Sequence, residues 1–529
     1  MKRTGHSTFI QKYFLTTAII ILSHLLPTGS VLSDVSLPGI FGDGMVLQQG
    51  MKIPVWGKAD PREKVTVSIN GRTKSTKTKG DGTWMVKMKK MNAGGPYEME
   101  VSGTNEIRFT DVMIGEVWVC SGQSNMNFRI RNLGDIPGQL GDADTPEIRM
   151  VTINTQKHEQ PQDDFIREKP AWIPCSSQDV GNFSAVAYFF GRDIHQELGV
   201  AVGLINASWG GTQAESWTPF EEIKSHPELN PIIHRWEELI VKYPETNARY
   251  EKEFAEWKKL QSAGKIGSKR PYAPPGSSRA DLPGGIYNAM IHPLIPYGMK
   301  GVIWYQGESN SQRGYQYRTL FKTMIRSWRE KWGQGTFPFL FVQLSNWETD
   351  TNPYTPKDGG NWPELREAQF IALELPKTAM AVTIDLGEKA DIHPKNKWDV
   401  GCRLALAALH IAYGGKAEYS GPLYYSMKIK NDSVMLRFHH ADGLTVKGGP
   451  LKGFEIAGDD RTFHAADARI EGNCVIVSGN NVKEPKAVRY AWDDYPQCNL
   501  YNSAGLPASP FRTDDWPRET EGRVLPFDW

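Results

Sequence analysis

The sequence predicts an α/β protein, with a mainly parallel central sheet covered by helices on both faces and a β-sandwich-like domain at each end. Three observations lead to this prediction. The chain has 529 residues, which suits two to four domains at ~100–200 residues each. Its middle part alternates short apolar runs with helical stretches, the pattern of a parallel sheet between helices. Its two ends instead carry short strand-like runs separated by turn residues.

The first predicted domain, residues 34–107, is built from short strands. Turn signals rich in Gly, Asp and Asn separate its apolar runs. The run Val65–Ile69 is followed by Asn70-Gly71, the pair that favours a two-residue hairpin turn. We therefore expect an antiparallel β domain with a hairpin at this turn.

The second predicted domain, residues 108–415, has the α/β pattern. Apolar runs typical of buried strands recur along it. They are Glu116–Cys120, Val200–Ile205, Gly301–Tyr305, Phe339–Gln343 and Ala379–Ile384. Residues 220–283 interrupt the alternation with two helical patterns separated by Pro244, followed by a stretch rich in Pro, Gly and Ser. This helical insertion is either a lid over a site or a helical pair on the surface.

The third predicted domain, residues 416–529, returns to short strands. Val434–Phe438 and Val475–Val477 are strand-like, and turn residues separate them from their neighbours. We expect a second β domain, and its packing against the first one is an arrangement that the sequence leaves open.

Residues 1–33 have the features of a signal peptide. Basic residues precede the apolar stretch Phe14–Leu26, which is short for a membrane-spanning helix, and Val31–Ser33 offers a cleavage region. We therefore expect an exported protein, periplasmic or secreted, without stable membrane insertion after signal removal. The net charge of +1 gives no support to a nucleic-acid partner, because no strongly basic face is implied.

The cysteine pattern is uninformative about chemistry. The five cysteines show no C-x-x-C spacing, so a zinc knuckle is disfavoured. An exported chain can form disulfides, although an odd number leaves at least one thiol unpaired within the monomer. Cys120 lies in an apolar run, and we expect it to be a small buried hydrophobe.

The first motif that carries chemistry is Ser121–Met126, which directly follows an apolar strand. A serine at a strand-to-helix turn is exposed at the carboxyl end of the strand, where α/β folds place their sites. Ser124 is therefore a candidate nucleophile, and its backbone N–H is a candidate oxyanion donor. The alternative is a serine that only caps the following helix.

The second motif, Asp385–Pro394, also follows an apolar strand. A serine hydroxyl needs a base, and a histidine base needs a carboxylate that holds its tautomer. His393 and Asp391 are two residues apart, so both can face one cleft. The alternatives are a helix cap and a metal pair, but one Asp-x-His lacks the further ligands that zinc requires. We predict no metal site.

Two further motifs offer donors for an oxyanion. Gly210 and Gly211 let backbone N–H groups approach a ligand closely, unless they form an ordinary turn. Gln306 or Asn310, at the end of another predicted strand, offers a side-chain N–H. Glu308 lies between them and is either functional or a buried structural carboxylate.

In combination these motifs resemble the sialate O-acetylesterase family, a branch of the SGNH (GDSL-like) hydrolases. The blocks are Gly-Gln-Ser-Asn-Met, Trp-Gly-Gly-Thr, Ile-Trp-Tyr-Gln-Gly-Glu-Ser-Asn and Asp-Ile-His-Pro, and the resemblance covers about residues 34–415. It implies a three-layer α/β/α hydrolase core, with Ser124 as nucleophile, His393 as base and Asp391 as the orienting acid. The third-block asparagine of the wider superfamily is replaced by Gln306, with Asn310 as its rival.

The resemblance and the residues together predict a serine esterase that removes O-acetyl groups from a glycan without metal or organic cofactor. Gln123, Asn125 and Glu308 are the predicted substrate contacts. The substrate is expected to be a 9-O-acetylated sialate, with acetylated xylan or another polysaccharide as the alternative. The sequence leaves the oligomeric state open.

Two other classes of function compete with the esterase. A glycoside hydrolase would use Glu308 with Asp385 or Asp391 as paired carboxylates. A non-catalytic glycan-binding protein would use the flanking β domains and the seventeen tryptophans. Neither explains Ser124, His393 and Asp391 together.

Overall fold

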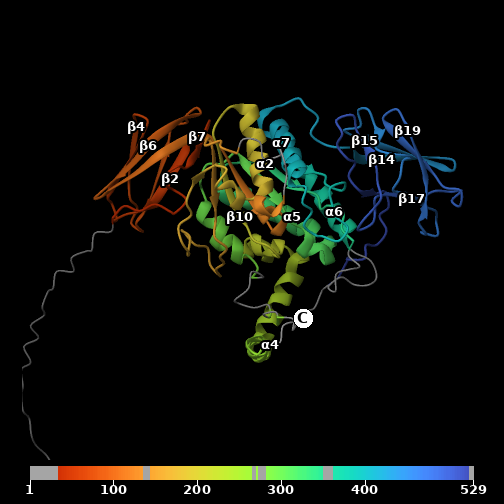
Figure 1. Ribbon diagram of the computed structural model, residues 1–529, viewed down its shortest axis with the longest axis horizontal. Helices are drawn as coiled ribbons and strands as arrows, with labels where there is room; N and C mark the ends of the chain where they lie inside the picture. Colours follow the sequence, from red (N-terminus) through yellow and green to blue (C-terminus); the bar gives the residue numbers. More distant parts are fainter. Residues whose placement is uncertain are drawn as a thin grey trace, which may run out of the picture.

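The computed structural model describes residues 34–134, 143–264, 270–271, 274, 282–348 and 361–523. The predicted signal peptide, residues 1–33, lies outside the described residues. Within them, no helix has the length and apolar character needed to cross a membrane. Figure 1 shows a central α/β region with a group of strands at either end.

The central sheet is parallel from its first strand to its sixth, as predicted. Its order is β13-β12-β11-β7-β10-β8-β9, and only the short edge strand β9 runs antiparallel. The strands are β7 (Glu106–Gly122), β8 (Ile148–Thr152), β9 (Ile173–Pro174), β10 (Val202–Ser208), β11 (Gly301–Tyr305), β12 (Phe339–Val342) and β13 (Thr378–Ala381). All five predicted strands are present, and β8 is an addition that the sequence analysis missed.

Helices cover both faces of this sheet. They are α2 (Ala185–Leu198), α5 (Gly314–Trp332), α6 (Trp362–Ile371) and α7 (Lys397–Tyr413). The register pairs Trp118 with Gly301 and Ser121 with Trp304, so Trp118 and Trp304 point to opposite faces. Trp118 packs on Phe190 of α2, and Trp304 packs on Trp328 of α5. The sheet is therefore sandwiched between two helical layers.

The N-terminal β region and the α/β region are joined by strand β7 and by a common hydrophobic core. The N-terminal strands are β1 (Val46–Gln48), β2 (Ile53–Lys58), β3 (Lys64–Ile69), β4 (Arg72–Lys77), β5 (Thr83–Met88) and β6 (Gly94–Ser102). The first part of β7 pairs with β6 and β1, and its last part pairs with β10 and β11. The domain boundary predicted at residue 107 therefore falls inside one continuous strand, and one hydrophobic core runs through both regions.

The predicted hairpin is confirmed. Ile69 of β3 pairs with Arg72 of β4, and the two residues between them, Asn70 and Gly71, have φ values of 48° and 68°. Positive φ at both central positions is the signature of the type I′ turn, which Asn-Gly favours.

The C-terminal region has a hydrophobic core of its own. Two four-stranded antiparallel sheets, β14-β15-β20-β19 and β18-β17-β21-β23, face each other across it. Their strands are β14 (Leu423–Lys430), β15 (Ser433–His439), β17 (Phe454–Ala457), β18 (His464–Ala465), β19 (Asp467–Glu471), β20 (Cys474–Ser478), β21 (Ala487–Tyr490) and β23 (Phe511–Arg512), and a small third sheet pairs β16 (Thr445–Val446) with β22 (Leu500–Tyr501). The α/β region separates these strands from the N-terminal ones, so the two β regions do not pack against each other (Figure 1).

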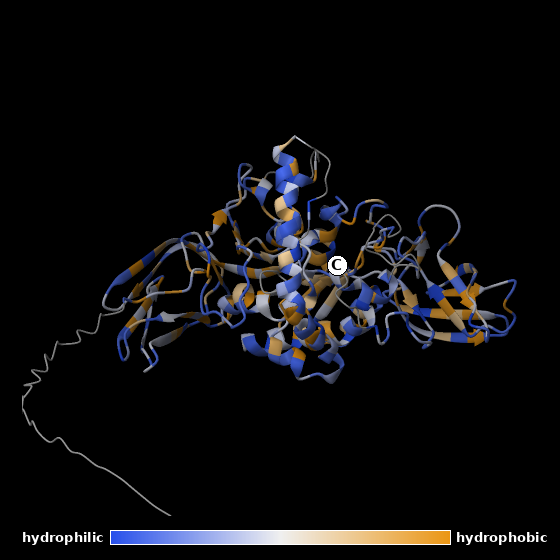
Figure 2. Cartoon of the chain, turned by 90° about the horizontal axis from the view of Figure 1, so that it is seen from below, coloured by the Kyte–Doolittle hydropathy of each residue, from blue (hydrophilic) through white to orange (hydrophobic). Residues whose placement is uncertain are grey.

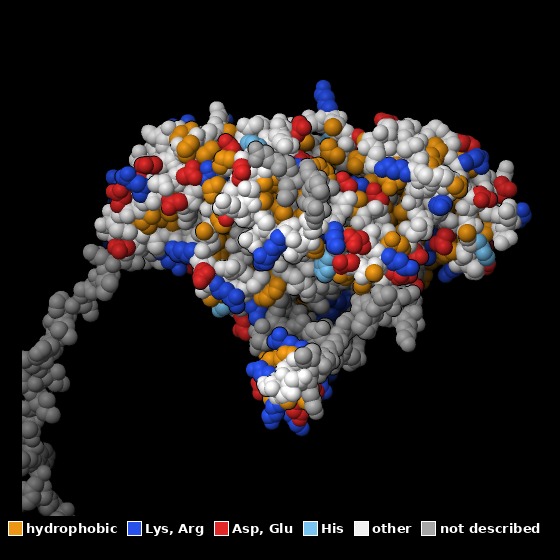
Figure 3. All heavy atoms as spheres, in the orientation of Figure 1, with side chains coloured by type: hydrophobic (Ala, Val, Ile, Leu, Met, Phe, Trp, Pro, Cys, Tyr) orange, Lys and Arg blue, Asp and Glu red, His pale blue; other side chains and the backbone are white. Residues whose placement is uncertain are grey.

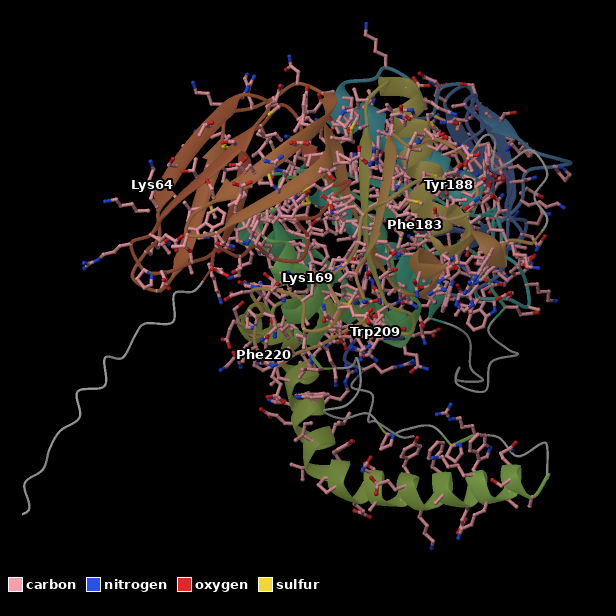
Figure 4. All side chains as sticks on the ribbon, turned by 60° about the vertical axis from the view of Figure 1, so that its left-hand side comes forward. Lys64, Lys169, Phe183, Tyr188, Trp209 and Phe220 are labelled. Atoms are coloured by element: carbon pink, nitrogen blue, oxygen red, sulfur yellow. The ribbon has the colours of Figure 1, made fainter. Side chains whose placement is uncertain are left out.

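The helical insertion differs from the prediction. After α3 (Phe220–Lys224), one long helix, α4 (Asn230–Ser262), continues through Pro244. Figure 4 shows that α4 bends along its length and projects from the body. A proline inside a helix removes one backbone hydrogen bond and favours such a bend. The expectation of two separate helices was therefore wrong, because Pro244 interrupts the hydrogen bonds without ending the helix.

The surface of α4 and of the body is predominantly polar. Figure 2 shows mainly hydrophilic residues along the projecting helix, whose buried side chains all lie at or before Leu239. On the face in Figure 3, basic and acidic side chains are interspersed. The five cysteines all lie within the described residues and are free thiols.

Candidate active site

The candidate nucleophile lies where the central strand ends. β7 runs to Gly122, and the single-turn helix α1 (Ser124–Asn127) begins two residues later. Gly122 has a φ of 136°, and a Cβ built there would lie 2.1 Å from the carbonyl oxygen of Tyr305, so only glycine fits. The Gln123 N–H donates to that same oxygen at 2.9 Å. The backbone just before Ser124 therefore lies in close contact with the end of the neighbouring strand β11.

The structure brings Ser124 and His393 together from opposite parts of the chain. His393 Nε2 lies 2.8 Å from Ser124 Oγ, within hydrogen-bond distance. Asp391 Oδ1 accepts the backbone N–H of His393 at 2.8 Å and lies 3.6 Å from its Nδ1. The imidazole of His393 therefore lies between the other two side chains. Its Nε2 faces the serine hydroxyl, and its Nδ1 faces the carboxylate of Asp391.

The helix-cap alternative for Asp391 and His393 is not what the structure shows. The N-cap of α7 is Asn396, whose side chain accepts the Asp399 N–H, so neither residue of the pair caps that helix. Among the described residues, no group of three or more metal-binding side chains is present.

His393 is only partly buried, with 37 % of its side chain exposed. Burial and the nearby Lys397 ammonium lower the pKa of its imidazole, while Asp391 acts in the opposite direction. A lowered pKa favours the neutral ring, which is the form that accepts a proton. The Phe128 ring lies alongside the imidazole, with centroids 6.5 Å apart.

Gly210 lies directly beside the serine. A Cβ built on Gly210 would sit 3.3 Å from Ser124 Cβ, whereas one on Gly211 would meet nothing within 4 Å. The preceding residue, Trp209 (labelled in Figure 4), donates its backbone N–H to Gly122 O at 3.0 Å. The glycine turn after β10 is thereby tied to the serine turn after β7.

Gln306 does not have the role of a free oxyanion donor. It is fully buried, and its Nε2 donates to Thr212 O at 3.2 Å and to Asn310 Oδ1 at 2.7 Å. Its Oε1 accepts from the Tyr317 hydroxyl at 2.9 Å. Both amide protons of Gln306 are therefore engaged within the protein in this structure.

Asn310 has a similar structural position. Its Oδ1 accepts from the Ala214 N–H at 2.9 Å, and its Nδ2 donates to Glu215 Oε2 at 2.8 Å. Gln306 and Asn310 thus both hold the segment that follows the glycine turn.

Glu215 anchors this cluster, and the sequence analysis missed it. Its Oε1 lies 2.5 Å from Arg235 and 2.8 Å from Arg313, and all three side chains are buried. Burial alone raises the pKa of Glu215, but the two guanidinium groups outweigh it and hold the pKa at about 2. These residues are far apart in sequence and form no motif, so no local signal identified them.

The three predicted substrate contacts are buried and bonded within the protein. Gln123 Oε1 accepts from the backbone N–H groups of Gly307 and Ser309, both at 3.3 Å. Asn125 Nδ2 donates to Glu308 Oε1 at 2.5 Å and to Ile392 O at 3.0 Å. These side chains join the loops that carry the candidate site.

Asp385 is structural as well. Its two oxygens receive Arg403 Nη1 and Nη2 at 2.7 Å and 2.8 Å. A carboxylate held in a bidentate ion pair is unsuited to act as acid or nucleophile. The ion pair of Asp385 and the contact of Glu308 with Asn125 therefore disfavour these two residues as the paired carboxylates of a glycoside hydrolase.

Comparison with known proteins identifies the family. The model of a family described as carbohydrate esterase, sialic acid-specific acetylesterase matches residues 277–410. Mouse sialate O-acetylesterase is 31 % identical over 511 residues, which cover 86 % of this chain and 90 % of the relative. The human sialate O-acetylesterase is 30 % identical over 505 residues, covering 86 % and 88 %. The chain belongs to the sialate O-acetylesterase family.

A solved structure agrees with this family membership. The crystal structure of a carbohydrate acetylesterase from Xanthomonas citri is 36 % identical, has a TM-score of 0.76, and covers 91 % of this chain and 100 % of that one. The chain is thus a carbohydrate acetylesterase, a carboxylic ester hydrolase, and the resemblance inferred from its motifs is confirmed. The glycoside hydrolase and the non-catalytic binding protein are no longer needed as alternatives.

Proposed function

We propose that this sialate O-acetylesterase family member works by serine acyl transfer, with Ser124 as nucleophile, His393 as general base and Asp391 as the acid that orients the imidazole. The observation that carries the proposal is the 2.8 Å contact between Ser124 Oγ and His393 Nε2 at the end of the central strand. That geometry is the one a nucleophile and its base require.

The reaction proceeds in two steps. Ser124 Oγ attacks the acetyl carbonyl while its proton passes to His393 Nε2. The tetrahedral intermediate collapses, the C–O bond to the sugar breaks, and the sugar oxygen leaves with the proton from His393. Water, deprotonated by His393, then attacks the acetyl-serine and releases acetate and the free hydroxyl of Ser124.

Backbone groups supply the oxyanion hole in this proposal. The Ser124 N–H lies at the start of α1, and Gly210, with Gly211 next to it, adjoins the serine. One such donor contributes roughly 3–4 kcal/mol of transition-state stabilisation. Gln306 and Asn310 act indirectly, because their amides hold the segment from Thr212 to Ala214.

For the substrate we propose an O-acetylated sialate, because the mouse and human relatives are sialate O-acetylesterases. The 9-O position is the one expected from the family resemblance, and acetylated xylan is the alternative. The test is acetate release from a 9-O-acetylated sialoglycan and from acetylated xylan, measured side by side with wild-type protein and Ser124→Ala. Release from the sialoglycan alone supports the proposed substrate, and release from xylan alone replaces it. If neither substrate nor a small acetyl ester is hydrolysed, the proposed function is wrong.

We also propose that the protein is exported and that residues 1–33 are removed. The proposal is supported by the basic start and short apolar stretch of the sequence. Expression of the full chain, followed by cell fractionation and N-terminal sequencing of the mature protein, tests it. An intact N-terminus in the cytoplasmic fraction would contradict it.

A further inference from the structure

One charged group behind the candidate site has no role in the mechanism above. Lys397 is the first residue of α7, and its side chain is fully buried. Lysine is almost never fully buried unless it is paired. The N-terminal end of a helix carries partial positive charge, so a cation there is unfavourable. A buried lysine at this position therefore needs compensating contacts.

The contacts of Lys397 lead directly to the serine turn and to the histidine loop. Its Nζ donates to Asn125 Oδ1 at 2.6 Å. Asn125 follows the nucleophile, and its Nδ2 donates to Ile392 O, the carbonyl between Asp391 and His393. One carboxamide, oriented by the lysine, therefore ties the serine helix to the histidine loop.

Aromatic rings and acids complete the surroundings of the ammonium group. Nζ lies 5.0 Å from the centroid of the Phe128 ring and 5.4 Å from that of Tyr305, distances at which a cation is attracted to an aromatic face. The acids that act on Lys397 are Glu308, Asp391 and Glu388. Glu308 Oε2 is buried without a hydrogen-bond partner. Burial raises the pKa of this Glu308 carboxyl, and the positive charge of Lys397 acts in the opposite direction.

We propose that Lys397 is a positioning residue of the esterase, which aligns Ser124 and His393 through the Asn125 carboxamide and contributes a positive charge to the surroundings of His393. The inference rests on the proposed function, because it assumes that His393 is the base. Lys397 acts through Asn125 and His393 and touches neither the acetyl group nor the reacting atoms.

The electrostatic part of this inference follows from the groups that face His393. Burial lowers the pKa of the imidazole most, Lys397 lowers it further, and Asp391 raises it. Burial lowers the pKa of Lys397 itself to about 7, so its charge is present in acid and decreases near neutrality. The charge is therefore present in the pH range where protonation of His393 would stop catalysis.

Two substitutions separate the two parts of the role. Lys397→Met removes both the donor and the charge, whereas Lys397→Gln keeps an N–H donor and removes the charge alone. Both variants should move the acid limb of the kcat/KM profile upward by about one pH unit, because a nearby cation no longer opposes protonation of His393. Lys397→Met should in addition lower kcat about tenfold at the pH optimum, with a smaller change in KM. The control is Lys395→Met, an exposed lysine of the loop that precedes α7, for which the profile should not move.

A double variant tests whether Lys397 is only a counter-ion. Glu308→Gln with Lys397→Met removes both buried charges, which protects the fold from a single uncompensated one. The acid limb should stay displaced in this variant. A wild-type profile in the double variant, or in both single Lys397 variants, would overturn the inference.

Measurements on the unaltered protein cover the remaining outcomes. If no Lys397 variant folds, the acid limb of the wild-type kcat/KM profile tests the inference. The inference requires the apparent pKa of that limb to lie below the ordinary histidine value of about 6.5. A limb at or above that value overturns the inference. Failure of the proposed function is recognised separately, since Ser124→Ala or His393→Ala would then retain turnover whatever the Lys397 variants do.

Discussion

Two buried glutamates stand behind the candidate site, and their environments are opposite. Glu215 supports the glycine turn and is saturated by two arginines and an asparagine, which lower its pKa. Glu308 supports the serine and histidine loops, has one oxygen without a partner, and has a raised pKa because burial dominates. Burial is complete or nearly so in both. The partners, not the depth, therefore decide whether a buried carboxylate is a fixed anion or a group that readily becomes neutral.

This difference divides the support of the site into two parts. The Glu215 cluster contains arginines, which keep their charge, so it is a rigid anchor for the glycine turn after β10. The Glu308 cluster contains a lysine, which can lose its proton, so its charge balance can change with pH. Substitutions in the two parts should therefore differ in their effects on activity and stability.

The largest effect is expected from Ser124→Ala. Loss of the nucleophile should reduce kcat by about 10⁴-fold or more while the fold is retained, since Ser124 is half-buried and holds neither cluster together. Acetate release and a circular dichroism spectrum check both parts. Turnover close to that of the wild type would contradict the proposed mechanism.

The next largest effect concerns stability. Glu215→Gln removes the buried carboxylate that Arg235 and Arg313 share, which should cost about 3–5 kcal/mol of unfolding free energy. Glu308→Gln is the matched control and should cost about 1 kcal/mol or less, because Lys397 can become neutral and Asn125 retains an acceptor. Urea unfolding of the two variants gives the comparison. Equal losses would show that the two clusters are not different in kind.

The pH dependence of stability should separate the two glutamates by sign. The folded-state pKa of Glu215 is lowered to about 2, so its contribution is present above its ordinary value of 4.5 and is lost as pH falls toward 2. The pKa of Glu308 is raised, so its contribution is present below 4.5 and is lost as pH rises through the folded value.

Unfolding free energies of wild type, Glu215→Gln and Glu308→Gln at a series of pH values test this. The advantage of wild type over Glu215→Gln should shrink on acidification, and its advantage over Glu308→Gln should shrink as pH rises. Slopes of the same sign for both variants would refute the assignment of opposite environments.

The smallest effect is expected from Gln306→Met. If Gln306 only holds the Thr212 carbonyl and Asn310, kcat should fall about tenfold or less. A direct oxyanion donor would instead be worth about 10²–10³-fold. Steady-state kinetics with an acetyl ester, alongside a thermal melt, distinguish these cases. A loss at the larger figure without destabilisation would restore Gln306 as an oxyanion donor.

The sequence by itself predicted the features that depend on neighbouring residues. Asn70-Gly71 specified a hairpin because its turn needs positive φ at two adjacent positions, and the apolar runs specified five parallel strands. The serine, glycine and Asp-x-His motifs were recognisable because each occupies a short loop directly after such a strand. Parallel strands end at one edge of a sheet, so their meeting there was foreseeable.

Only the tertiary structure decided which buried polar side chains pair with one another. The side chains of Gln306 and Gln123 form hydrogen bonds within the protein. Glu215 forms ion pairs with Arg235 and Arg313. Lys397 donates a hydrogen bond to Asn125, 272 positions away in the sequence. The physical reason is that a buried donor or acceptor must find a partner wherever the fold places one. That choice depends on packing between distant segments, and no local pattern in the chain records it.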